Sequence, residues 1–100
     1  MLISKLEVEM DMLERHLLIL KHVIEQEPIG IMKLSEVTRL PRHKVRYSLR
    51  VLEHEGLIGP STHGAVTTEK TRRFVGSLGV RIAGLGRKFD EVRKLGSELK

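Results

Sequence analysis

Apolar residues recur along the first part of the chain in alternating steps of three and four positions. They are Ile3, Leu6, Met10, Leu13, Leu17, Leu20 and Ile24. This is the a/d spacing of a heptad repeat, which predicts a long helix over residues 3–27 with one apolar stripe. Further apolar residues widen the stripe from about Met12 onward, so we expect this helix to have two packing partners. One is the rest of its own domain, and the other is a second copy of the chain or a folded-back C-terminal helix.

A second apolar stripe lies in the segment from Pro41 to Ile58. It consists of Val45, Leu49 and Leu52. Their spacing places them on one side of a helix over about residues 41–55, and this side is expected to face the core. Gly56 is placed to end that helix in a left-handed conformation, after which Leu57 and Ile58 return the chain to the core.

Shorter elements connect these two helices. Pro28 disfavours helical backbone at Glu27, so the first helix should close there. Residues 29–31 then form an extended link, and residues 32–40 form a short helix. Its inward-facing residues are expected to be Leu34, Val37 and Leu40. A proline break leads straight into the next helix, so the two helices must cross steeply.

The rest of the chain predicts a hairpin and a second long helix. Two strand-like runs flank a turn in which Gly64 can take a positive φ. Thr67 or Thr68 can cap the following helix, over residues 68–99. Its apolar stripe is Phe74, Leu78, Ile82, Leu85, Phe89, Val92, Leu95 and Leu99. Another side carries a strip of small residues, Gly76, Gly79, Ala83 and Gly86. These glycines favour a kink or break near residues 84–86.

This order of elements predicts a mainly α fold with a small β-hairpin and long N-terminal and C-terminal helices. We expect one domain over residues 1–100 with its core at about residues 12–75, because 100 residues support one modest core without a roomy catalytic cleft. With 40% apolar residues and no Trp, aliphatic side chains must fill that core. The absence of cysteine excludes disulfides and thiolate zinc sites, and it suits a reducing cytoplasm.

The sequence also bears on location. The first twelve residues carry acids where a secretory signal needs an apolar run, and no window approaches eighteen consecutive apolar residues. We therefore expect a soluble, cytoplasmic protein that does not enter a membrane. An alternative is that residues 75–86 rest on an anionic membrane surface as part of an amphipathic helix.

Positive charge is concentrated in the second part of the chain. The net charge is +5, but residues 1–40 hold five Lys/Arg against seven Asp/Glu, whereas residues 41–100 hold thirteen against six. This asymmetry favours a polyanionic partner, either a nucleic acid or an anionic membrane surface. The simpler alternative is that the charge only keeps a small protein in solution.

The side of the 41–55 helix opposite its apolar stripe is basic and carries an aromatic residue. It holds His43, Tyr47, Arg50 and His54, with Lys44 and Arg46 on its flanks. No acidic residue precedes Glu53 in this segment. The alternative is an ordinary solvated helix surface, and Tyr47 could equally lean on the hairpin.

Patterns typical of catalysis or metal binding do not occur. No two of the five histidines are spaced by three or four residues, and no cysteine could assist them. Nothing resembles a nucleophile elbow, a phosphate loop or a paired-carboxylate site. We expect neither enzymatic activity nor a metal or other cofactor.

The complete order of elements resembles the winged helix-turn-helix transcriptional regulators of prokaryotes and archaea. Leu34-Ser35 with Thr38–Pro41 looks like the small-residue helix and turn of that family. Glu55–Ile58 is similar to the entry to its wing, and Thr67–Lys70 resembles the threonine-started helix after the wing. The similarity covers about residues 12–75.

The chain departs from the family pattern at three positions. Arg39 and Thr71 stand where the family commonly has Gly, and His63 is the only basic residue at the hairpin tip. At Arg39 we expect a turn that tolerates a side chain, and this side chain can point at a phosphate.

The resemblance implies binding to double-stranded DNA, with the 41–55 helix in the major groove. Residues near the start of such a helix reach deepest, and the expected base contacts are Arg42, His43, Arg46 and Tyr47. The expected phosphate contacts, which position the protein without reading sequence, are Lys33, Arg39, Lys44, Arg50, His63, Arg72 and Arg73. The alternative is a winged helix that binds only proteins. No small-molecule effector is assigned.

The heptad pattern and the small-residue strip favour a homodimer joined by the helices over residues 1–27 and 68–99. The expected interface residues are Ile3, Leu6, Met10, Leu13, Leu78, Ile82, Leu85, Phe89 and Val92. A two-fold dimer would place two recognition helices one DNA turn apart, which predicts an inverted-repeat operator.

Overall fold

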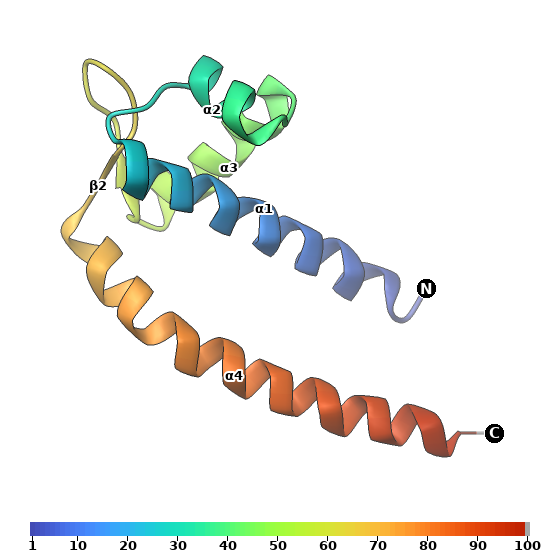
Figure 1. Ribbon diagram of the computed structural model, residues 1–100. Coiled ribbons are helices and arrows are strands. Elements are labelled where there is room, and N and C mark those ends of the chain that lie inside the picture. The colour runs from blue at the N-terminus through green and yellow to red at the C-terminus, as the bar shows by residue number, and fades with distance from the viewer. Residues whose placement is uncertain (100) are drawn as a thin grey trace.

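The computed structural model describes residues 1–99, which form four helices and one two-stranded hairpin (Figure 1). In chain order the elements are α1 (Ser4–Gln26), α2 (Ile31–Thr38), α3 (Arg42–His54), β1 (Ile58–Gly59), β2 (Val66–Thr67) and α4 (Glu69–Glu98). The predicted fold class is confirmed: the chain is mainly α, with a small hairpin and long first and last helices, in a winged-helix arrangement. Every predicted helix end lies within one or two residues of the observed one.

The core lies where α1, α2 and α3 meet the hairpin. Its buried apolar residues are Ile19, Leu20, Val23, Ile29, Leu34, Val45, Leu52, Leu57 and Ile58. Val45 and Leu52 come from the apolar stripe of α3, and Leu49 of the same stripe packs against the cluster half-buried. Phe74 adds a contact from the first turns of α4. The core therefore holds α3 by its inner side and leaves the opposite side to solvent.

The C-terminal end of α1 is tied to the hairpin. As predicted, the helix ends just before Pro28, and Glu27 has the extended ψ of 142° that a following proline favours. The Glu27 carboxylate accepts hydrogen bonds from the amide of Thr67 at 2.8 Å and from its hydroxyl at 2.9 Å. These bonds fix β2 against the end of α1.

α3 ends at Gly56, whose φ of 77° confirms the predicted left-handed stop. The amide of Leu57 donates to the carbonyl of Leu52 at 2.9 Å, and the amide of Gly56 donates to that of Glu53 at 3.0 Å. These are the two bonds of a Schellman motif, which satisfies carbonyls that a helix end leaves without partners.

The hairpin is short and depends on one glycine. β1 and β2 pair antiparallel with Ile58 opposite Thr67. The extended link after α1 adds a single bridge, in which Ile29 and Ala65 exchange hydrogen bonds of 3.1 and 2.7 Å. Gly64 has a φ of +129°, and a Cβ at this position would lie 2.4 Å from the carbonyl carbon of Ile29. Both the backbone conformation and the close approach therefore require glycine.

α4 begins with a capping box formed by two threonines. The hydroxyl of Thr68 accepts from the amide of Lys70 at 3.2 Å, and the hydroxyl of Thr71 accepts from the amide of Thr68 at 2.9 Å. Thr68 is thus the cap, rather than Thr67. Thr71 is buried and also donates to the carbonyl of Leu57 at 2.7 Å. This bond ties the first turn of α4 to the chain just after α3.

α4 then continues without interruption to Glu98, so the predicted kink or break near residues 84–86 does not occur. Within residues 1–99, the glycines with positive φ are Gly56 and Gly64, both outside α4. The glycines of α4 therefore keep a helical backbone despite their lower propensity. Thirty residues at about 1.5 Å each give a helix about 45 Å long.

The molecule is elongated because two helices extend beyond the core. Its principal dimensions are 56 × 28 × 21 Å, and its radius of gyration is 16.1 Å, whereas a compact domain of this size has about 13 Å. Figure 1 shows α1 and α4 running alongside each other, with the start of α1 and the end of α4 far from the hairpin. The N-terminal half of α1 and the C-terminal half of α4 form this projecting part.

Candidate nucleic-acid interface

The outer side of α3 faces solvent. His43, Arg46, Tyr47 and Arg50 are all exposed, as are Arg42 and Lys44. Val45 and Ser48, on the inner side, are completely buried. Packing of the inner side thus fixes the direction in which the basic side chains point.

A shallow concavity of about 470 Å³ gathers most of this basic surface. It is lined by Arg15, His43, Lys44, Arg46, Tyr47 and Arg50. Arg15 comes from α1 and was not among the predicted contacts. Arg15, from a second helix, thus joins five polar side chains of α3 in lining the concavity.

The positive charge of α3 is not neutralised by the protein. None of the ion pairs within residues 1–99 involves a side chain of α3, and its first turn holds no acid. Unpaired cations at the N-terminal end of a helix add to the positive end of the helix dipole. This surface is therefore suited to a polyanion.

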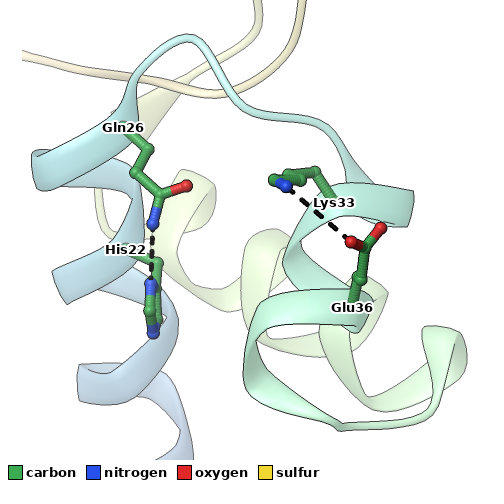
Figure 2. A network of polar contacts seen from close by, with 4 residues as sticks. All are labelled: His22, Gln26, Lys33 and Glu36. Atoms are coloured by element: carbon green, nitrogen blue, oxygen red, sulfur yellow. Dashed lines mark hydrogen bonds and ion pairs between the residues drawn. The ribbon is translucent and has the colours of Figure 1, made fainter.

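Lys33 has a different environment from the cations of α3. Its ammonium lies 3.8 Å from the carboxylate of Glu36, one turn later in α2. Figure 2 shows this pair near the hydrogen bond of 3.2 Å between His22 and Gln26 of α1. Both partners of the ion pair are well exposed, so it contributes little to stability. Lys33 can exchange this contact for a phosphate at small cost.

The turn between α2 and α3 holds Arg39 in a left-handed conformation, with φ 60° and ψ 25°. Local hydrogen bonds brace it: the hydroxyl of Thr38 donates to the carbonyl of Leu34 at 2.6 Å, and the hydroxyl of Ser35 donates to the carbonyl of Leu40 at 2.6 Å. A non-glycine residue in this conformation costs about 1–2 kcal/mol. The turn tolerates a side chain, as predicted, and the exposed Arg39 adds another cation near the start of α3.

His16 of α1 touches α3 directly. Its Nδ1 lies 2.8 Å from the hydroxyl oxygen of Ser48, and its ring centroid lies 6.0 Å from that of Tyr47. Tyr47 thus leans on α1 rather than on the hairpin. Burial lowers the pKa of His16, the charge of Arg15 lowers it further, and Glu9 opposes both. The neutral imidazole is therefore the form that the folded chain favours.

The histidine and serine of this contact do not form a catalytic pair. A nucleophilic serine must be reachable by substrate, whereas Ser48 has no accessible surface. The hydrogen bond instead satisfies a buried hydroxyl, which would otherwise destabilise the core. Its role is to position α1 against α3.

The remaining predicted phosphate contacts lie away from the α3 concavity. His63 is exposed at the hairpin tip, beside Ser61, whose hydroxyl and amide bond the carbonyl of Gly64. Arg73 lines a separate concavity at the start of α4, together with Lys70 and Arg81. The structure thus brings five predicted contacts of α3 together around the concavity, namely His43, Lys44, Arg46, Tyr47 and Arg50. The predicted contacts that do not line it are Arg42, Lys33, Arg39, His63, Arg72 and Arg73.

Two contributors to the site, Arg15 and His16, were missed by sequence reasoning. Both lie on α1, whose heptad pattern draws attention to packing rather than to polar contacts. A weak signal was present, since His16 and Arg15 are the polar residues of α1 just before its fully apolar run. Only the crossing of α1 and α3 brings them to the basic surface.

The residues predicted for the dimer interface form two partly exposed rows along α1 and α4. Ile3, Leu6, Met10, Leu13, Ile82, Leu85, Phe89 and Val92 are each between 36% and 55% exposed, and Leu78 is half-buried. Between the helices lies an open groove of about 330 Å³, lined mostly by these side chains. α4 thus runs beside α1 of its own chain without covering it.

No group of three or more His, Asp or Glu side chains within residues 1–99 is arranged to hold a metal ion. In the same part of the chain, no helix has the length and apolarity needed to cross a bilayer.

Comparison with known proteins supports the fold. No family model matches the sequence, and no curated protein matches it either. Among solved structures, the activation domain of the phage T4 transcription factor MotA is similar, with a TM-score of 0.56 and 21% sequence identity over 70% of this chain and 75% of that one. At this identity the likeness establishes a shared fold.

Proposed function

We propose that this chain is a sequence-specific regulator of transcription that binds double-stranded DNA in the cytoplasm as a homodimer. The observation that carries the proposal is the basic surface of α3, which is exposed, forms no ion pair with any of residues 1–99 and is held by its apolar side on the core. An α-helix fits the major groove, where each base pair presents a distinct pattern of donors and acceptors.

The exposed residues divide into two roles. Arg42, His43, Arg46 and Tyr47, near the start of α3, contact base edges. The remaining cations near this surface contact phosphates, and Arg15 joins Lys44, Arg50, Arg39 and Lys33 in this role. Phosphate contacts fix the position of the protein on the duplex, whereas base contacts select the sequence. Outside the α3 concavity, we propose weaker phosphate contacts for His63, Arg72 and Arg73.

The homodimer explains the apolar rows on the projecting halves of α1 and α4. A two-fold axis through those helices presents two copies of α3 to one face of the duplex. The half-sites are then related by inverted symmetry and lie about 34–36 Å apart, one helical turn. The proposal contains no catalytic step and no cofactor.

The proposal is tested by titrating a fluorescent mixed-sequence duplex with the full chain at about 50 and 200 mM salt. We expect binding at low salt that weakens steeply at high salt, because each neutralised phosphate releases counterions. Selection from random duplexes should then enrich an inverted repeat. No binding at low salt by a folded protein would contradict the proposal.

A second candidate function is a protein-interaction module. It is favoured by the similarity to a domain described as an activation domain, and by the exposed apolar rows on α1 and α4. A folded chain that shows no affinity for any duplex would favour this alternative. Loss of DNA binding upon substitution of exposed α3 cations would disfavour it.

A further inference from the structure

The projecting halves of α1 and α4 expose apolar side chains that their own chain leaves uncovered. The groove between the helices is open, and Glu14 is the one charged residue among those that line it. Exposed apolar surface of this extent marks a contact with another molecule. The charges beside the groove indicate what that molecule is.

The residues that flank the two apolar stripes carry opposite charges. In α1 the flanking heptad positions hold Glu7, Glu9 and Glu14. In α4 the corresponding positions hold Arg81, Lys88 and Arg93. All six side chains are exposed. Residues at such positions decide which helices pair and in which orientation.

Pairing of like helices is disfavoured by these charges. Two copies of α1 would bring glutamates together, and two copies of α4 would bring cations together. Within one chain, no ion pair joins α1 to α4 in residues 1–99, and Lys88 and Arg93 bond only to acids of α4 itself. Those exposed pairs are weak. Pairing of α1 with α4 of another copy covers both stripes and joins opposite charges.

We propose that a second copy of the chain occupies this surface, with α1 of each protomer packed against α4 of its partner. The inference rests on the homodimer of the proposed function and specifies which helices meet. A two-fold axis makes this contact twice, so the dimer contains two identical pairs of unlike helices. Gly79 and Gly86 lie among the flanking positions of α4 and allow close approach of the partner helix.

Charge reversal tests the pairing. One variant carries Glu7→Lys, Glu9→Lys and Glu14→Lys, and the other carries Arg81→Glu, Lys88→Glu and Arg93→Glu. Each variant alone places like charges along both contacts, so its dimer dissociation constant should rise by at least about tenfold. An equimolar mixture should restore dimers containing one chain of each variant, because both contacts then join opposite charges.

Analytical ultracentrifugation of the wild type, each variant and the mixture provides the measurement. A matched control, Arg87→Glu with Lys94→Glu on the outward side of α4, should remain as dimeric as the wild type. Circular dichroism verifies folding, and the single reversals Glu14→Lys and Lys88→Glu give the same test in a milder form.

The outcomes separate the pairing from the function. A wild-type dimer whose variants stay dimeric alone, or fail to combine when mixed, overturns the pairing and leaves the homodimer standing. A wild type that sediments as an 11.4 kDa monomer at all concentrations overturns both. DNA binding by α3 is measured separately and does not depend on which helices meet.

Discussion

The Nδ1 atom of His16 lies 2.8 Å from the hydroxyl oxygen of Ser48, and this contact joins α1 to the buried side of α3. Ser48 is one position from Tyr47, whose ring also lies beside His16. The helix that projects toward the proposed dimer contact therefore touches the helix proposed to read DNA. A substitution at His16 should therefore affect the packing of both α1 and α3.

The first prediction concerns pH. Because the pKa of His16 is lowered in the folded chain, the unfolded chain takes up a proton at higher pH than the folded one. The free energy of unfolding should then decrease as pH falls through about 6.5 and level off below the folded pKa. Urea unfolding at pH 8, 6.5 and 5 measures this dependence.

His16→Asn provides the matched control, because its amide can still bond Ser48 but does not titrate. The variant should lose less stability than the wild type between pH 8 and pH 5. Glu9 and Arg15, the charged groups that act on His16, are unchanged in it. If the free energy of unfolding of both proteins depended on pH equally, His16 would not contribute to the pH dependence of stability.

The second prediction separates reading of bases from contact with phosphates. Arg46→Ala should weaken binding to the selected operator by about 1–3 kcal/mol per half-site and relax selectivity at one base pair. Lys44→Ala should weaken binding to all duplexes alike and reduce the salt slope by about 0.9 per protomer. Fluorescence anisotropy on operator and scrambled duplexes distinguishes them.

Arg87→Ala is the control for both variants, because it removes the same charge from the outward side of α4. It should change DNA affinity much less than either substitution in α3. If all three variants weakened binding equally, net charge alone would account for the affinity, and the assigned roles would be wrong.

The third prediction concerns two glycines whose replacement by alanine should change stability in opposite directions. Gly64→Ala should destabilise the chain by more than about 1 kcal/mol, since φ is +129° and the new Cβ would collide with the backbone of Ile29. Gly76→Ala should stabilise it by about 0.8–1 kcal/mol, because nothing lies within 4 Å of the new methyl group in an exposed helix. Thermal unfolding of both variants checks the sign of each effect.

Local patterns in the sequence were enough to predict the helices and their ends. The spacing of Val45 and Leu52 identified the inner side of α3, and Gly56 identified its end, because periodicity and helix stops depend on neighbouring residues. The prediction of a break near residues 84–86 was wrong because it also depended on a local property, the low helix propensity of glycine. Glycine lowers helix propensity without forbidding a helix, and α4, which starts from the capping box at Thr68, stays helical through Gly84 and Gly86.

Contacts between distant segments could not be predicted in the same way. Arg15 and His16 reach the basic surface only because α1 crosses α3, and they are 28 or more residues from the side chains they join. The position of Tyr47 against α1 rather than the hairpin has the same origin. Sequence reasoning therefore identified the surface of α3 but not the helix that completes it.

The last prediction concerns the left-handed Arg39, where stability and binding should change in opposite directions. Glycine adopts this conformation without the cost of about 1–2 kcal/mol that a side chain incurs. Arg39→Gly should therefore unfold at the same or a higher temperature than the wild type, while its DNA affinity and salt slope decrease. Arg39→Lys keeps both the charge and the strained backbone, so it should leave stability and binding nearly unchanged. If Arg39→Gly binds DNA as tightly as the wild type, Arg39 does not contact phosphate, and its presence in the turn requires another reason.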